Sequence, residues 1–216
     1  MIDLLIKELP PSFITDLQHA VPNIYREAHQ QAFVQPLWED SEARYLIGHF
    51  RHALFAAHFR KAARNAGLKT GLQRVPTGSY QYTWVRAGRL LLTASAVQSE
   101  DDAELRYAEF REQHATVNHL LTNPVLPFMD QADLNALETV YGIVVHAPYE
   151  DDKSQCSYVG IGIPAHETMQ WVERLSLAEL SKAQAETNRA ETEQLEDQAF
   201  PRKKDKRKEG TGDEQQ

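Results

Sequence analysis

Apolar positions recur at helical spacing along the first third of the chain. Within residues 11–37 they lie three or four apart, but prolines interrupt them, so this stretch predicts short helices broken at Pro22 and Pro36. A much longer pattern starts at a predicted cap, Asp40-Ser41, and runs to about Asn65, after which Gly67 is expected to end the helix. We expect this second segment to form the long central helix of the fold.

The hydrophobic period then changes from that of a helix to that of a strand. Threonine, tyrosine, valine and leucine dominate three segments, which predict strands over residues 70–75, 79–86 and 89–97. Ala87-Gly88 between the last two segments is typical of a tight hairpin turn. Two further strands are predicted at residues 139–147 and 156–163, with residues 148–155 as the loop between them.

Three more helices complete the pattern. They are expected at residues 99–121, at residues 131–138, and after Pro164, where the helix would include Trp171, Val172 and Leu180. This order of elements predicts an α+β fold with a mainly antiparallel sheet of about five strands, packed with the long central helix and flanking helices. Residues 1–180 would form a single domain. Residues 181–216 lose their large apolar side chains and are expected to form an exposed helical extension and a disordered charged tail.

Composition narrows the class of protein. Hydrophobic residues make up 42% of the chain and its mean hydropathy is -0.53, which suits a globular core and excludes a membrane-spanning protein. The start of the chain lacks the basic segment of a secretory signal. Its lone cysteine, Cys156, excludes a disulfide framework and is expected to serve as a small apolar side chain. A cytoplasmic location is therefore expected.

Charge is segregated along the sequence, although the formal net charge is -8. The 46 residues from Arg44 to Arg89 contain no aspartate or glutamate. Nine cations lie in this basic segment: Arg44, Arg51, Arg60, Lys61, Arg64, Lys69, Arg74, Arg86 and Arg89. Such asymmetry indicates either a surface for an anionic partner, nucleic acid first among them, or internal neutralisation by the acidic residues of 100–112.

The basic segment supplies the candidate binding residues. Arg44, Arg51 and His58 lie seven apart, which places them on one stripe of the central helix. Further phosphate contacts are expected from the helix end and the hairpin, at Arg60, Lys61, Arg64, Arg74, Arg86 and Arg89. Tyr80, Tyr82 and Trp84 alternate along one strand, so they form either a stacking platform for bases or part of the core.

No catalytic signature accompanies these residues. The sequence has no phosphate-binding loop, because Gly160-Ile161-Gly162 lies inside a strand, and no metal-ligand or nucleophile motif. The leading hypothesis is a non-catalytic binding or regulatory protein for an anionic partner, without metal or cofactor. One alternative is a protein-interaction module that meets an acidic protein or a second copy of itself. The other is an enzyme that uses the arginines together with His49, His52 and His58.

Overall fold

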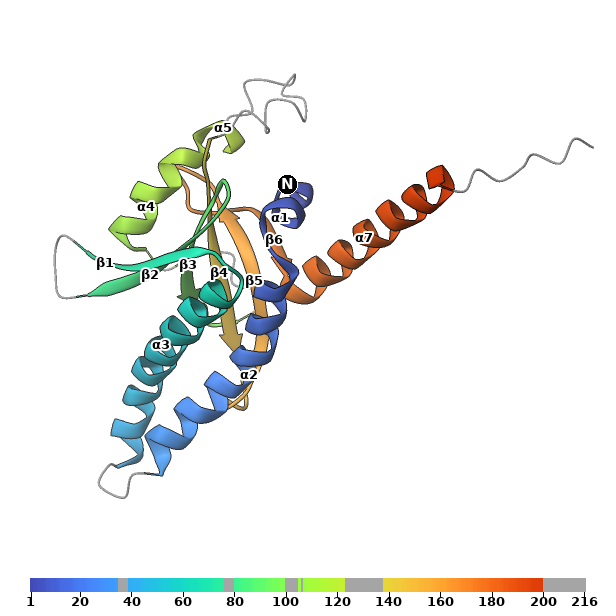
Figure 1. Cartoon of the computed structure of the whole chain (residues 1–216). Coiled ribbons are helices and arrows are strands. Elements are labelled where there is room, and N and C mark those ends of the chain that lie inside the picture. The colour runs from blue at the N-terminus through green and yellow to red at the C-terminus, as the bar shows by residue number, and fades with distance from the viewer. Residues whose placement is uncertain (35–38, 76–79, 100–104, 106, 123–137, 200–216) are drawn as a thin grey trace, which may run out of the picture.

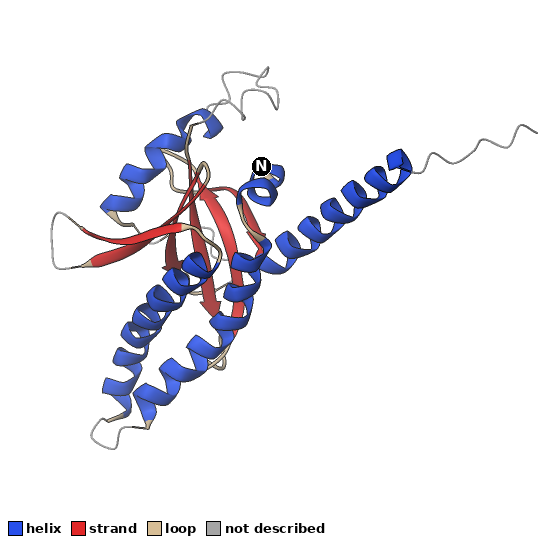
Figure 2. Cartoon of the chain, viewed as in Figure 1, coloured by secondary structure: helices blue, strands red, loops and turns tan. Residues whose placement is uncertain are grey.

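In the computed structural model, a six-stranded sheet lies between two groups of helices (Figures 1 and 2). The structure describes residues 1–34, 39–75, 80–99, 105, 107–122 and 138–199. The fold is α+β with a mostly antiparallel sheet, as the sequence predicts, although the sheet has one strand more than expected. Within the described residues, no helix combines the length and the apolar character needed to cross a membrane.

Two antiparallel units make up the sheet. Strands β1 (Lys69–Arg74), β2 (Gln81–Ala87) and β3 (Leu90–Ala96) form the first, and β4 (Val140–Pro148), β5 (Cys156–Pro164) and β6 (Trp171–Ser176) form the second. The two units join where β3 pairs with β4 in parallel. The order of the strands across the sheet is the same as their order in the sequence. The chain between them passes through α4 (Glu109–Ala115), a 3-10 turn (Thr116–Asn118) and α5 (His119–Thr122).

One face of the sheet carries the larger core. It packs against α1 (Ile2–Glu8), α2 (Pro11–Phe33), α3 (Asp40–Asn65) and the start of α7 (Leu177–Ala199). The fully buried side chains here include Phe13, Leu17, Phe59, Val85, Leu92, Val144 and Ile161. The side chains from 185 to 193 are exposed, and this part of α7 projects away from the body (Figure 1).

The opposite face is covered by α4 and the 3-10 turn that follows it. Asn118 fixes this layer, because its buried amide donates to the carbonyl oxygens of Tyr141 and Pro164 and accepts from the Tyr141 amide. Each bond is 2.8–2.9 Å long. One side chain therefore satisfies backbone groups of both β4 and β5 that would otherwise be buried without partners.

Three local expectations are corrected. Pro22 does not break its helix, because buried residues on both sides of it, among them Val21 and Tyr25, hold α2 against the core as one element. Residues 171–176 form an edge strand rather than a helix, because they pair with β5. Of the helix expected over residues 99–121, the structure describes α4 from Glu109, with Ala108 at its N-cap, while residues 100–104 and 106 lie outside the described residues. The helix expected at residues 131–138 lies largely outside the described residues, and the tail after residue 199 lies wholly outside them.

Candidate functional site

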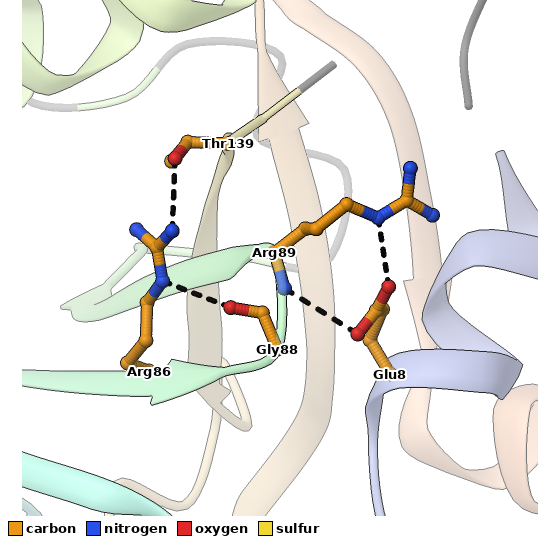
Figure 3. Close-up of polar contacts among 5 residues, drawn as sticks. All are labelled: Glu8, Arg86, Gly88, Arg89 and Thr139. Carbon is orange, nitrogen blue, oxygen red and sulfur yellow. Dashed lines mark hydrogen bonds and ion pairs between the residues drawn. The ribbon is translucent and has the colours of Figure 1, made fainter. Parts of the chain in front are cut away.

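Arg60, Arg86 and Arg89 bind other parts of the chain, and the first two do so through neutral acceptors. Arg60 on α3 donates from Nη1 to Thr83 Oγ1 on β2, at 2.8 Å. Arg86 donates to the Gly88 carbonyl oxygen and to Thr139 Oγ1, each at 2.9 Å (Figure 3). Each of these guanidinium groups is therefore committed to a partner within the chain.

Arg89 is neutralised by an acid from outside the basic segment. Its Nε lies 2.8 Å from Glu8 Oε1, and its backbone amide also donates to that carboxylate (Figure 3). The two side chains are 23% and 14% exposed, so water screens the pair only in part. This ion pair joins the end of α1 to the β2–β3 turn. Internal neutralisation thus occurs at this residue through an acid of α1. Much of the predicted acidic partner, residues 100–104 and 106, lies outside the described residues.

The aromatic residues of the second predicted strand do not form one exposed platform. Tyr82 is buried, stacks on Phe110 of α4 with ring centroids 4.1 Å apart, and shares a hydrogen bond of 2.9 Å with His114. Trp84 is half-buried and packs so closely over Gly71 that a Cβ there would lie 2.9 Å from the indole. Tyr80 is 47% exposed and stacks on His52 of α3. Core packing therefore accounts for Tyr82.

The exposed cations lie at opposite ends of α3. Lys61 and Arg64 lie near its C-terminal end, and Lys69 follows at the start of β1. None of these three forms an ion pair with another described residue. Arg44 is exposed near the other end of the helix, about 30 Å away at 1.5 Å per residue. Arg74, at the end of β1, is exposed as well, and His58 is half-buried.

Arg44 and Arg51 meet on one concave surface. A groove of about 790 Å³ separates the first half of α3 from the end of β3 and the loop between β4 and β5. Its lining includes Arg44, Gly48 and Arg51 from α3, His29 from α2, and Asp151, Asp152 and Lys153 from the loop. Two members of the predicted stripe therefore lie together, whereas His58 lines neither this groove nor the cavity that adjoins it.

The loop acids are not ion-paired with these arginines. The Asp152 carboxylate accepts hydrogen bonds from Ser154 and Gln155, and those bonds lower its pKa. No ion pair within 4.0 Å joins Asp151 or Asp152 to any residue in the described part of the chain. The three cations and two carboxylates of the lining leave the groove with one surplus positive charge before His29 is counted.

A smaller cavity of about 70 Å³ opens beneath α3, next to the groove. We call it the inner pocket. Gly48, Arg51 and Ala96 line both spaces. Its other lining residues come from α3 and from three adjacent strands: His52, Phe55, Ala56, Tyr82, Thr83, Ala94, Ser95 and His146. The walls are mainly apolar, with a few converging polar groups, which is the usual composition of a small-molecule site.

One lining residue of this pocket, His146, belongs to a buried polar pair. Tyr25 of α2 and His146 of β4 share a hydrogen bond of 2.7 Å between the phenol oxygen and Nδ1. Burial, together with the nearby charge of Arg51, lowers the pKa of His146 to about 3. Burial also raises the pKa of Tyr25, so both groups are neutral at physiological pH. Phe55 stacks on the imidazole at 4.3 Å and holds its plane.

Arg51 connects the buried pair to the groove. Its guanidinium carbon lies 4.8 Å from the centre of the Tyr25 ring, a cation–π distance. Its Nε is buried and has no hydrogen-bond partner among the described residues. Beside it, burial raises the pKa of the Cys156 thiol to about 11 and lowers the pKa of His52. Half-buried cations of this kind are costly unless a counter-charge or hydrogen-bond acceptor meets them.

Sequence reasoning missed Tyr25, His146 and Gly48. Two signals were present in the chain: a histidine stands inside the otherwise apolar strand β4, and a glycine stands inside a long helix. A side chain could fit at position 48, because a Cβ built there meets no atom within 4 Å. No group of three or more potential metal-ligating side chains occurs in the part of the chain that the structure describes.

Comparisons with known proteins add no family to this geometry. No protein-family model matches the sequence, and no curated protein or solved structure matches it significantly. The site must therefore be interpreted from its own residues.

Proposed function

We propose that this chain is a non-catalytic binding protein that holds an anionic ligand in the groove, through Arg51 and Arg44. The observation that carries the proposal is the placement of Arg51. Its guanidinium is half-buried, has a buried Nε without a described partner, and forms a wall of an open groove. An anion seated there would supply both the missing acceptor and the missing counter-charge.

The remaining groups of the groove fit this role. Arg44 lies two helical turns before Arg51 and lines the same space, so both guanidinium groups can face one ligand. Lys153 adds a third cation from the opposite wall, while Asp151 and Asp152 limit the total negative charge that the groove can accept. A small anion with one or two negative charges suits this balance better than a highly charged one.

Ligand-dependent stabilisation tests the proposal. Inorganic phosphate is titrated into the purified protein while its melting temperature is recorded, because a ligand that binds only the folded state raises that temperature. We expect a saturable rise for the native chain and for Arg64→Gln, which changes an exposed cation far from the groove. Arg51→Met, which keeps the length of the side chain, should abolish the rise. An equal response of Arg51→Met and the native protein would refute the role of Arg51.

Nucleic acid is a second candidate ligand for the same segment. It is favoured by the exposed side chains of Lys61, Arg64 and Lys69, which a small anion seated at Arg51 would not reach. Lys61 alone lies about 15 Å further along the helix. A phosphodiester chain could contact both regions, whereas the buried Tyr82 could not stack on a base without unpacking from α4.

Fluorescence anisotropy with labelled single- and double-stranded oligonucleotides tests this candidate. Because counterions are released on binding, affinity should fall steeply with salt, and the slope should become shallower in a Lys61→Gln, Arg64→Gln double variant. Absence of binding at low salt would exclude nucleic acid as the partner.

A further inference from the structure

The inner pocket is a second compartment of the site and differs in chemistry from the groove. Apart from Arg51, which it shares with the groove, it is lined by neutral or apolar side chains and by His52. Among the described residues, no carboxylate lines it. His146, which lines the pocket, is 3% exposed and neutral, and one hydrogen bond of this ring is described, between Nδ1 and the Tyr25 hydroxyl. Nε2 is therefore the imidazole nitrogen without a hydrogen bond among the described residues.

The size of the inner pocket limits what can enter it. A water molecule accounts for about 30 Å³ of liquid, and an engineered apolar cavity of about 150 Å³ accommodates benzene. A space of about 70 Å³ is therefore too small for an aromatic ring or a nucleobase. It is large enough for a group of two or three heavy atoms, such as a hydroxymethyl group.

Gly48 lies where the two compartments meet. It lies inside α3 and lines both spaces, and no surrounding atom would prevent a side chain there. Glycine inside a helix costs about 1 kcal/mol relative to alanine, and here neither packing nor backbone geometry requires it. A glycine at this position would be explained if it leaves access from the groove to the inner pocket.

We propose that the ligand is a small hydroxylated organic anion, with its acid group at Arg51 in the groove and its neutral hydroxyl end in the inner pocket, beside His146 and Ser95. This inference rests on the proposed function, because it assumes the anion at Arg51. Arg51 lies at the boundary of the two compartments, so an acid group and a hydroxyl separated by a short carbon chain can reach both. Ser95 is buried, and among the described residues its hydroxyl donates one long bond of 3.2 Å, to the Ala96 carbonyl oxygen.

Matched pairs of probes separate the two compartments. Calorimetric titration compares glycerol 3-phosphate with inorganic phosphate, and glycerate with acetate, so that each pair differs by the hydroxylated carbon chain. We expect the native protein to bind the hydroxylated member of at least one pair ten times more tightly or better. The pair that shows the preference identifies the acid group as phosphate or carboxylate.

Two test variants and one control change the inner pocket but leave Arg44, Arg51 and Lys153 in place. Gly48→Leu places a side chain at the junction, and Gly48→Ala is its small control; His146→Phe keeps the ring that stacks on Phe55 but removes its nitrogens. We expect Gly48→Leu and His146→Phe to bind both members of a pair within about threefold of each other. Gly48→Ala should retain most of the preference. Circular dichroism melting curves confirm that each variant is folded, and Gly48→Leu suffices if His146→Phe is not.

The outcomes distinguish this inference from the proposed function. If the native protein binds the simple anions through Arg51 but shows no preference within either pair, the inner pocket is not a ligand compartment and the present inference is wrong. A preference that survives in Gly48→Leu also overturns it. If Arg51→Met binds every probe as tightly as the native chain, or if no probe binds, then the proposed function fails, and this inference fails with it.

Discussion

Acidification tests whether His146 is buried and neutral in the folded protein. The imidazole lies between Tyr25 and Phe55, is 3% exposed, and has a pKa lowered to about 3. In the unfolded chain the same group has a pKa of about 6.5. The folded protein therefore binds fewer protons than the unfolded chain at any pH between these two values.

The sign and size of the effect follow from this difference. Above pH 6.5 both states hold His146 neutral and its titration does not affect stability. As the pH falls below 6.5, the unfolded chain takes up the proton and the folded protein does not, so the free energy of unfolding decreases. The decrease is about 1.4 kcal/mol for each pH unit, which gives a loss of about 1.4 kcal/mol between pH 7.5 and pH 5.5 from this residue.

Urea denaturation at these two pH values measures the loss, and a histidine variant isolates the share of His146. His146→Gln keeps an amide that can donate to or accept from the Tyr25 hydroxyl, and its pH-dependent loss should be smaller than that of the native chain by about 1.4 kcal/mol. His19→Gln is the matched control, because His19 is exposed. Groups that do not interact with His146, such as His114, contribute equally to native and variant protein, so the difference reports His146 together with its coupling to His52. Equal losses in the native chain and in His146→Gln would refute a buried neutral imidazole, as would an NMR titration in which this ring protonates near pH 6.5.

Three further variants test the packing described above by urea denaturation at pH 7.5. Phe59→Ala should lower the free energy of unfolding by about 3–5 kcal/mol, because the ring is fully buried against Phe13; a loss below 1 kcal/mol would mean that this core is misassigned. Gly88→Ala should lower it by at least about 1–2 kcal/mol, since φ is +52° and the new Cβ would collide with the Glu8 carboxylate; unchanged stability would contradict the turn. Gly48→Ala should raise it by about 1 kcal/mol, and a decrease would show that the space beside it is filled.

Local sequence patterns predicted most helices and strands correctly. They failed where contacts between distant residues determine the secondary structure or the strand pairing. The central helix was predicted with its bounds, because the signals for both ends are local in the sequence, although the N-cap is Glu39, in a capping box with Glu42, rather than Asp40-Ser41. Residues 171–176 alternate weakly and continue into a true helix, so their pairing with β5 could not be inferred from spacing alone. Likewise, the pairing of β3 with β4 in parallel depends on residues 50 positions apart, such as Leu90 and Val140.

The sequence predicted which charged residues belong to the candidate site, but it did not predict which residues they contact. The acid-free segment identified Arg44 and Arg51, and the structure places both at one groove. However, the acid that binds Arg89 is 81 residues away, on a helix that was not expected. His146 is a single polar residue in an apolar strand, and only the fold reveals that Tyr25 and Arg51 surround it. The sequence therefore identified the helix that carries Arg44 and Arg51. The groove and the inner pocket could not be predicted, because their lining residues come from elements far apart in the sequence.

The parallel pairing of β3 with β4 has a consequence for how the site is assembled. Each antiparallel unit is built from near neighbours, whereas the seam between β3 and β4 closes a much longer loop and carries a larger entropic cost. The inner pocket straddles this seam, since Ser95 belongs to one unit and His146 to the other. A ligand that touches both strands would act as a clasp across the seam, and its binding energy would oppose the separation of the two halves of the protein.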